Sequence, residues 1–196
     1  MKVSVILAHP NTASFNHAIA ETVVATLKKN GHEVFYHDLY QENFDPLLPA
    51  RELPCDATLP PVIEDHCNEI SDADGIIIIH PVWWGAPPAI LMGWINRIMR
   101  PGIAFEFIET EDCDGMPHGL LKAQKAIVFN TSNTTPEMDK TFFGEPLENI
   151  WKKCILGLCG IEQVQRKVCT VVITSTQEQR EKWLEEAREM VVNTFG

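Results

Sequence analysis

Short apolar runs alternate with longer amphipathic segments along the whole chain. The apolar runs predict strands over Lys2–Ala8, His32–Leu39, Gly75–Ile79, Ala123–Asn130 and Lys167–Ile173. In three of these runs, at 3–8, 76–79 and 168–173, nearly every residue is apolar. Such runs are typical of parallel strands that are covered on both faces.

The intervening segments repeat their apolar residues with the period of a helix. They predict helices over Phe15–Lys29, Val62–Ala73, Ala89–Arg100, Leu147–Leu158 and Gln177–Val192. Five strands alternating with five helices predict one α/β domain over residues 1–196, with a parallel sheet between two layers of helices. The flavodoxin-like strand order 2-1-3-4-5 fits this count better than a six-stranded Rossmann sheet. Neither G-x-G-x-x-G nor a Walker A motif occurs.

Composition and charge exclude several classes of partner. The net charge of −11 argues against nucleic acid and against an anionic membrane surface. The six cysteines form no C-x-x-C pair and lack nearby histidines at zinc-site spacing, so we expect no metal site. Cys169 lies in an apolar run, which predicts a buried thiol. With no signal-peptide pattern and no apolar run of membrane-spanning length, we expect a cytoplasmic protein without membrane insertion.

Three loops should meet at the carboxyl edge of the sheet, where open α/β sheets bind ligands. The first, His9–Asn16, joins a buried strand to a helix start and is rich in hydrogen-bond donors. The free N–H groups and the positive dipole end of that helix favour a phosphate. Taken alone, the segment is equally well explained as an ordinary turn with Ser14 as the helix N-cap.

The other two loops suit a flat ring. Residues 80–88 carry Trp83 and Trp84 between prolines, followed by Gly85, which permits close backbone approach. Residues 130–136 are a run of hydroxyls and amides. Adjacent residues of an extended loop point in opposite directions, so one tryptophan should face a ring while the other packs inward. A ligand with a phosphate at one end and a heteroaromatic ring at the other, such as flavin mononucleotide (FMN), would satisfy all three loops.

Several motifs resemble one known family over nearly the whole chain. They are Leu7-Ala8-His9-Pro10 with Ser14-Phe15-Asn16, Asp38-Leu39-Tyr40, Phe44-Asp45-Pro46, Pro81 to Trp94, and Gly119-Leu120-Leu121. Together they are similar to the NAD(P)H:quinone oxidoreductase group of the flavodoxin-like superfamily. The resemblance implies FMN, or FAD, as cofactor and NADH or NADPH as electron donor. It also implies two-electron reduction of a quinone or similar small electrophile, in a homodimer whose active site lies at the subunit boundary.

The resemblance also implies which residues contact the cofactor. His9, Ser14, Phe15 and Asn16 would contact the phosphate, and the ring would meet Pro81, Val82, Trp83, Trp84, Thr131, Ser132 and Asn133. Gly85 and Asn130 complete the expected site from the loop argument. We expect Trp84 and Thr131 to position the ring and backbone N–H groups of 131–134 to stabilise negative charge on it. No side-chain acid or base is required, and His80 at a strand end is expected to be structural.

The chain also departs from the family pattern. Residues 131–134 replace the family's usual Thr-Thr-Gly-Gly, and 141–144 contain no counterpart of the active-site histidine of some members. A more apolar substrate side is therefore expected. A one-electron flavodoxin carrier and a regulatory subunit of a membrane transporter stay open as alternatives. A phosphotransfer protein would need an acidic cluster after the first strand, which this sequence lacks.

Two long loops and one helix bear on assembly. Loops 43–61 and 102–119 are long enough to be lids or partner contacts. The predicted helix Ala89–Arg100 is apolar around most of its circumference, so it should leave a face that needs cover. We therefore expect a two-fold dimer built on this helix, with loop 102–119 contributing to the partner's pocket.

Overall fold

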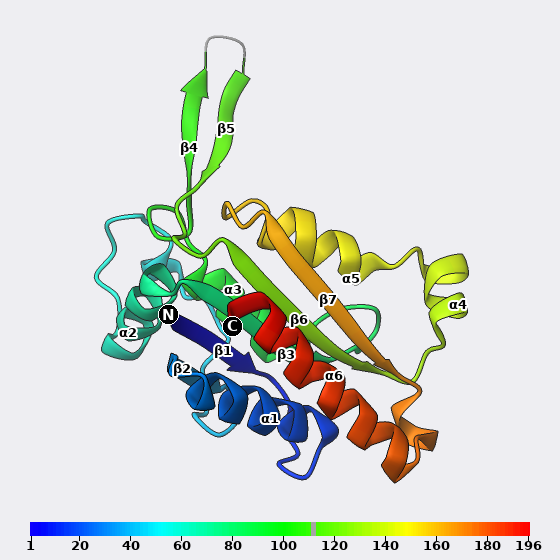
Figure 1. Cartoon of the computed structure of the whole chain (residues 1–196). Helices are drawn as coiled ribbons and strands as arrows, with labels where there is room; N and C mark the ends of the chain where they lie inside the picture. Colours follow the sequence, from blue (N-terminus) through cyan, green and yellow to red (C-terminus); the bar gives the residue numbers. More distant parts are fainter. Residues whose placement is uncertain (111–112) are drawn as a thin grey trace.

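Five parallel strands form the central sheet of the computed structural model, which describes residues 1–110 and 113–196 (Figure 1). The strands lie in the order β2-β1-β3-β6-β7. Their bounds are β1 Lys2–Leu7, β2 Glu33–Asp38, β3 Gly75–Pro81, β6 Lys125–Ser132 and β7 Gln163–Thr170. Without the two strands β4 and β5, which lie outside this sheet, the order is the expected 2-1-3-4-5.

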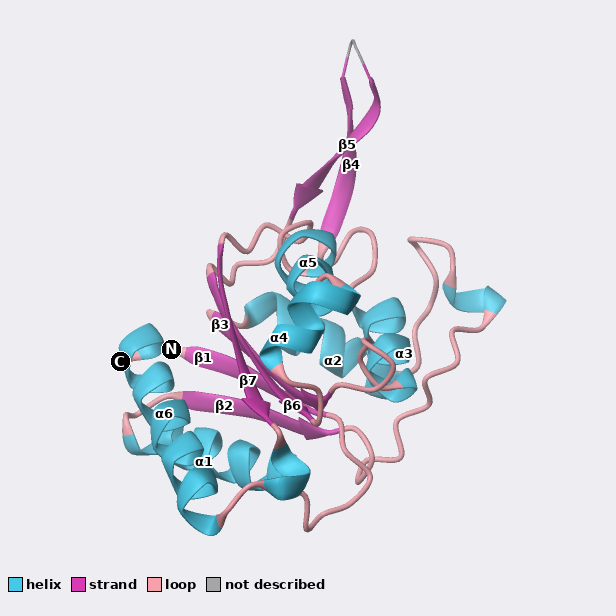
Figure 2. Ribbon diagram, turned by 90° about the vertical axis from the view of Figure 1, so that its right-hand side faces the viewer, coloured by secondary structure: helices cyan, strands magenta, loops and turns pink. Residues whose placement is uncertain are grey.

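Helices cover both faces of the sheet (Figures 1 and 2). On one face, α1 (Phe15–Lys29) and α6 (Gln177–Phe195) pack their apolar stripes against the strands. The other face carries α2 (Pro61–Asp72), α3 (Ala89–Ile98) and α5 (Pro146–Asn149), which continues as a π-helix over Ile150–Ile155. The remaining short turns are 3₁₀ Ala50–Glu52, α4 Pro136–Met138, π Asp139–Phe143 and 3₁₀ Val172–Thr174. No helix in the described ranges is both long and apolar enough to cross a membrane.

The last strand begins and ends earlier in the chain than the predicted strand Lys167–Ile173. That run, 168–173, was expected to be a strand covered on both faces, but β7 begins at Gln163 and ends at Thr170. β7 is an edge strand that pairs only with β6, and most of its side chains are partly or fully exposed. Its position is set by backbone pairing with β6, from Lys125 opposite Gln163 onward. An edge strand needs no continuous apolar run, so polar residues begin it.

A projecting hairpin replaces the expected loop at 102–119. β4 (Phe105–Thr110) and β5 (Cys113–Gly119) form an antiparallel ladder that stands away from the body of the protein (Figure 2). Among the loop's acidic residues, Glu111 and Asp112 lie outside the described residues. Phe107, Ile108 and Met116 are exposed along the hairpin. A two-stranded ladder is marginal by itself in water, and these exposed apolar side chains would gain stability from further contacts.

The α3 helix is covered more completely than its composition predicted. Apart from Ala89 and Asn96, its residues are buried or partly buried against the sheet, α2 and loop 43–61. That loop is fixed to α3: Arg97 donates to both carboxylate oxygens of Glu52, at 2.9 and 2.8 Å, and to the Asp45 carbonyl at 2.7 Å. Pro46 approaches Gly93 so closely that a β-carbon there would clash. The expected uncovered apolar face on α3 is therefore largely absent.

Candidate functional site

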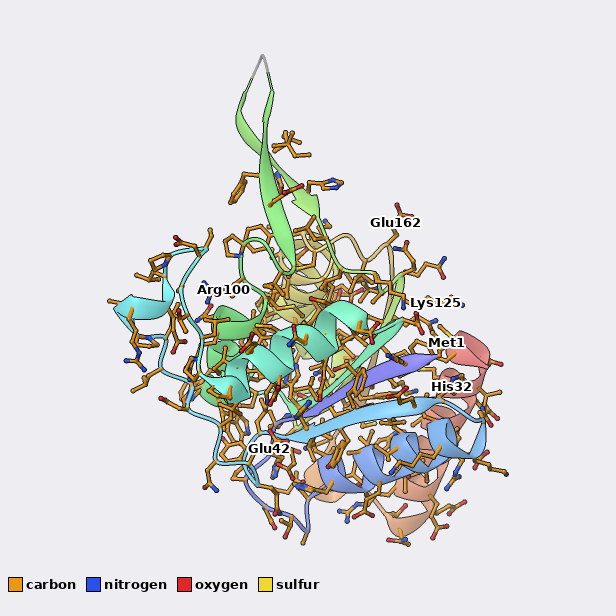
Figure 3. All side chains as sticks on the ribbon, turned by 90° about the vertical axis from the view of Figure 1, so that its left-hand side faces the viewer. Met1, His32, Glu42, Arg100, Lys125 and Glu162 are labelled. Atoms are coloured by element: carbon orange, nitrogen blue, oxygen red, sulfur yellow. The ribbon has the colours of Figure 1, made fainter. Side chains whose placement is uncertain are left out.

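The three loops predicted to meet do line one cavity at the carboxyl edge of the sheet. Figure 3 marks the two edges: Met1, His32 and Lys125 stand where strands begin, and Glu42 follows the far end of β2. The cavity has a volume of about 340 Å³, which is within the size range of small-molecule sites. It is lined by His9, Ser14, Phe15, Asn16, Pro81, Val82, Trp83, Thr131, Ser132, Asn133, Thr134, Val172 and Ile173.

One end of the cavity is the start of α1. Ser14 is the N-cap, and its hydroxyl oxygen accepts from the His17 N–H at 3.3 Å. The N–H groups of Phe15 and Asn16 take part in no hydrogen bond among the described residues. His9 Nδ1 lies 3.1 Å from the Asn11 N and 3.2 Å from the Asn11 carbonyl oxygen, so its ring is held by the Asn11 backbone. This end therefore offers several free N–H donors at the positive pole of a helix.

The tryptophan loop makes a tight turn rather than an extended segment. Trp83 and Ala86 exchange two backbone hydrogen bonds, of 3.1 and 2.9 Å. The two residues between them, Trp84 and Gly85, have φ angles of 56° and 68°. Positive φ at both positions defines a type I′ turn, which glycine enters freely and tryptophan only with strain. Both tryptophans consequently project outward: Trp83 is 40% exposed and Trp84 is 99% exposed.

This turn corrects two expectations about the loop. We expected one tryptophan to pack inward, but the alternation of an extended loop does not apply across a two-residue turn. Trp84 and Gly85 also do not line the first cavity. They line a second one of about 400 Å³, together with Phe143, Pro146 and Asp139. Val82 and Thr134 border both cavities, so the two are adjacent.

The loop after β6 is tied to the other two sides of the cavity. Asn16 Nδ2 donates to Thr131 Oγ1 at 2.9 Å, and Val82 N–H donates to the Thr131 carbonyl at 2.8 Å. Ser132 Oγ accepts from Thr134 N–H, so that amide is already engaged and is not free to stabilise charge. Asn133 Oδ1 accepts from Ile173 N–H, which brings the segment after β7 into the site. Sequence reasoning missed Val172 and Ile173 because it placed them inside a strand.

Asn130 is the one expected site residue that lines neither cavity. It is fully buried, its Nδ2 bonds His80 Nε2 at 2.9 Å, and its Oδ1 accepts from Arg166 Nε at 2.7 Å. The strand register decides this: Asn130 pairs with His80 inside the sheet, and the exposed loop begins only afterwards. Asn130 supports the site from beneath and does not line it.

His80 is structural, as expected. Its Nδ1–H donates to the Pro81 carbonyl at 2.8 Å, and its Nε2 accepts from Trp151 Nε1 at 3.0 Å and from Asn130. Burial lowers the pKa of His80 to about 4, and the hydrogen bond to Pro81 only partly opposes it. A neutral, fully bonded imidazole with no exposed surface cannot deliver a proton to a ligand.

A separate titratable cluster lies at the end of β2, outside both cavities. His37 bonds Glu42 at 2.9 Å and Glu69, and its ring stacks on His66 with centroids 3.9 Å apart. His37, Glu42 and His66 are close enough together to suggest a metal site. However, His66 Nδ1 accepts from Trp94 Nε1–H at 3.0 Å, so its proton sits on the Nε2 that would have to bind the metal. The cluster is therefore a hydrogen-bonded ion network rather than a metal centre.

Comparison with known proteins places the chain among redox enzymes of one fold. A family model described as having a flavodoxin-like fold matches residues 1–192. An uncharacterized NAD(P)H oxidoreductase of Haemophilus influenzae is 34% identical over 165 residues, which cover 82% of this chain and 79% of that protein. The ribosyldihydronicotinamide dehydrogenase [quinone] of Mus musculus is 28% identical, over 93% of this chain and 87% of the mouse protein.

Among solved structures, the NAD(P)H:quinone oxidoreductase from Methanothermobacter marburgensis superposes with a TM-score of 0.82. It is 26% identical to this chain, and the match covers 98% of this chain and 96% of that one.

Proposed function

The chain belongs to the family with the flavodoxin-like fold, and we propose that it is a flavin-dependent NAD(P)H oxidoreductase that reduces a quinone or similar small electrophile. The single observation that carries this proposal is the convergence of three loops on one cavity, beside a second, more apolar one. The first cavity offers phosphate donors at the start of α1 and, beside them, the aromatic side chain of Trp83, whose ring centroid lies 6.1 Å from that of His9. Relatives named as NAD(P)H and quinone oxidoreductases support the same activity.

The residues present fit FMN. His9, Ser14 and the first-turn amides of α1 suit its phosphate. Asn16 Oδ1 is buried with no hydrogen-bond partner among the described residues, and Asn16 lines the cavity. A buried acceptor without a partner is costly, and a ligand hydroxyl or N–H would satisfy it. Trp83, Pro81 and Val82 form a wall against which the flavin ring can lie.

When bound, the flavin supplies the hydride chemistry, and the protein supplies position and exclusion of water. We infer that NAD(P)H and the acceptor occupy the second cavity in turn, which gives a ping-pong reaction. Trp84 and Phe143 offer flat apolar surfaces there for a nicotinamide or a quinone. The absence of a lysine, arginine or histidine among the described residues that line this cavity is consistent with an apolar acceptor.

The active unit is, in this proposal, a homodimer. The projecting hairpin leaves the side chains of Phe107, Ile108 and Met116 exposed. Near its base, Ile95, Met99, Cys154, Ile155 and Leu158 line an apolar groove of about 320 Å³. The exposed apolar side chains of the hairpin are typical of an interface. A cytoplasmic location is consistent with the free thiols of Cys55, Cys67, Cys154, Cys159 and Cys169.

A direct test is flavin content. Purified protein should release about one FMN per chain on heating, and the stripped protein should quench FMN fluorescence with saturable binding. Failure to bind either FMN or FAD would refute the proposal. A one-electron carrier is the alternative, and it would bind FMN but would not be reduced by NADH or NADPH.

A further inference from the structure

Ser14, His17 and Asp38 form a chain of hydrogen bonds that leads away from the phosphate end of the cavity. Ser14 lines the cavity, His17 lies one turn along α1, and Asp38 ends β2. Ser14 Oγ is 2.9 Å from His17 Nδ1, and His17 Nε2 is 2.8 Å from Asp38 Oδ2. Both His17 and Asp38 are buried. They lie behind Ser14 and do not line the cavity, so they act on a ligand through the Ser14 hydroxyl and through their charge.

The partners of Asp38 decide where the imidazole proton sits. Asp38 Oδ1 accepts from the N–H groups of Tyr40 and Gln41, both at 3.2 Å, so its carboxylate serves as an acceptor on both oxygens. His17 Nε2 must therefore donate to Oδ2. In a neutral imidazole the other nitrogen, Nδ1, then carries a lone pair. It can only accept, and the donor available to it is the Ser14 hydroxyl.

This arrangement occupies the Ser14 proton. With His17 neutral, the hydroxyl proton points to Nδ1, and Oγ also accepts from the His17 N–H. The side of Oγ that faces the cavity then presents a lone pair, which repels a phosphate oxygen. With His17 protonated, Nδ1–H donates to Oγ and the hydroxyl proton is free to point into the cavity. Oγ then accepts two hydrogen bonds and donates one, which uses its full capacity.

The cavity also lacks a fixed positive charge. Among the described residues that line it, none is lysine or arginine. His9 is the only titratable lining residue, and burial lowers its pKa, with the neighbouring His17 charge acting in the same direction. Its protonated form is therefore disfavoured, and His9 is a poor source of fixed charge. Neutral donors alone would compensate the charge of a dianionic phosphate poorly. An imidazolium at His17, which is hydrogen-bonded to Ser14, would supply the missing positive charge.

We propose that His17 is a positioning residue that couples binding of the cofactor's phosphate to uptake of one proton. The proton comes from solvent and ends on His17 Nδ1, and no other bond is made or broken. Asp38 stabilises the imidazolium as its ion-pair partner. This inference rests on the proposed flavin function, because the phosphate is that of FMN. Binding of a flavin without a phosphate should not take up the proton.

The groups around His17 permit this role. Asp38 bonds it from β2, and Tyr36 lies two residues before Asp38 on the same strand. His9 faces it from the loop after β1 with ring centroids 6.3 Å apart, and Glu21 lies one turn further along α1. Burial, reinforced by the charge of Asp38, raises the pKa of Tyr36 to about 12, so this phenol stays neutral. Histidine is the side chain whose charge changes in the range of about pH 5–8. His17 is the member of this group that bonds both the cavity-lining Ser14 and a buried carboxylate, so we assign the linked proton to it.

The test compares FMN with riboflavin, which lacks the phosphate, on flavin-free protein. Fluorescence titrations from about pH 7 to 9 avoid the second ionisation of the FMN phosphate, whose pKa is about 6. The Kd for FMN should rise by up to about tenfold per pH unit, the slope for one linked proton. The Kd for riboflavin should not change. Calorimetry in two buffers of different ionisation enthalpy should show proton uptake with FMN and none with riboflavin.

Variants separate this linkage from a structural role. His17→Gln should lose the pH slope for FMN, while the matched variant His9→Gln should weaken FMN binding but keep the slope. Ser14→Ala should lower FMN affinity at pH 7 by about tenfold or more and weaken the slope, because the hydroxyl whose orientation depends on the His17 proton is gone.

The outcomes distinguish the two proposals. Equal pH dependence for FMN and riboflavin, or a slope that persists in His17→Gln, would overturn the coupling and leave the flavin function intact. If some variants do not fold, the calorimetry on the unaltered chain still decides, and no proton uptake with FMN would overturn the coupling. Failure of the unaltered protein to bind either flavin at any pH would instead refute the proposed function.

Discussion

Asn16 Nδ2 donates to Thr131 Oγ1 across 2.9 Å, and this bond joins the loops that follow β1 and β6. Both side chains are buried, at 2% and 7% exposure, although 115 residues separate them in the sequence. The bond sets the distance between the phosphate end of the cavity and the loop that faces the ring. The site is therefore held open by the fold before any ligand arrives.

Thr131→Val should destabilise the protein by about 1–3 kcal/mol, because it leaves the Asn16 amide unpaired at almost unchanged volume. Urea unfolding of the flavin-free protein measures this. The double variant Asn16→Leu with Thr131→Val removes both partners and should recover most of the stability. It should still bind FMN more weakly than the unaltered chain. A single variant as stable as the unaltered chain would show that the bond does not brace the site.

The two tryptophans should differ in what they bind. Trp83→Ala removes the wall of the first cavity and should weaken both FMN and riboflavin by about tenfold or more, as judged from the roughly 1–3 kcal/mol of an aromatic stacking contact. Trp84→Asn removes the ring from the second cavity at a residue type that tolerates positive φ. It should leave FMN affinity unchanged and slow both half-reactions. A loss confined to one half-reaction would contradict the shared cavity for donor and acceptor.

The His37 network predicts a window of pH in which it stabilises the fold. Burial disfavours the His37 imidazolium, but hydrogen bonds to Glu42 and Glu69 outweigh it and raise the pKa of His37. Burial likewise opposes the charge on Glu42, yet bonds from His37 and His66 lower its pKa to about 2. Stability from His37 is thus present below the ordinary histidine pKa and lost as the pH rises through its raised value. The stability that Glu42 contributes is present above the ordinary carboxyl pKa and is lost as the pH falls toward about 2.

The corresponding measurement is the free energy of unfolding of the unaltered chain and of His37→Gln across this range. The difference in the free energy of unfolding between the two proteins should be largest at about pH 5–6 and should shrink at alkaline pH. A difference that is constant with pH would mean that His37 acts only through packing.

The hairpin arm predicts concentration-dependent assembly. Phe107→Ser combined with Ile108→Ser should raise the dimer dissociation constant at least about tenfold for each apolar side chain, since burial of one is worth about 1.5–3 kcal/mol. Sedimentation velocity reports the change. Leu53→Ser, which alters a side chain of similar exposure (64%, against 62% for Phe107) on loop 43–61, is the matched control and should leave assembly unchanged. An unaltered chain that is monomeric at micromolar concentration and fully active would contradict the dimer.

Apolar periodicity was sufficient to predict the parallel sheet and the meeting of three loops. Buried strands such as β3 carry a continuous apolar run, and their order follows from short right-handed crossovers. Features that depend on particular backbone hydrogen bonds, or on a partner elsewhere in the chain, could not be predicted in this way. The place of Trp84 in the second cavity could not be predicted, because it follows from the hydrogen-bonded turn at 83–86. Tryptophan is also not a residue that indicates positive φ.

Three further differences have a related cause. Loop 43–61 lies against α3 because Arg97 and Glu52 form a buried pair across 45 residues, and charges in a loop do not reveal such a partner. The start of β7 was missed because an edge strand is defined by its neighbour and carries little apolar signal. Asn130 was assigned to the site from its place at the strand end, but one residue of register turned it into the sheet.

The central claim is that the two cavities serve electron transfer from a reduced nicotinamide through a bound flavin. Anaerobic rapid mixing of the FMN-loaded protein with one equivalent of NADH or NADPH tests it most directly. The flavin absorbance should bleach fully with one of the two donors, faster than steady-state turnover. A small quinone mixed in afterwards should restore the absorbance in a second step. Absorbance that stays unbleached with both donors would contradict the account and identify the protein as a carrier.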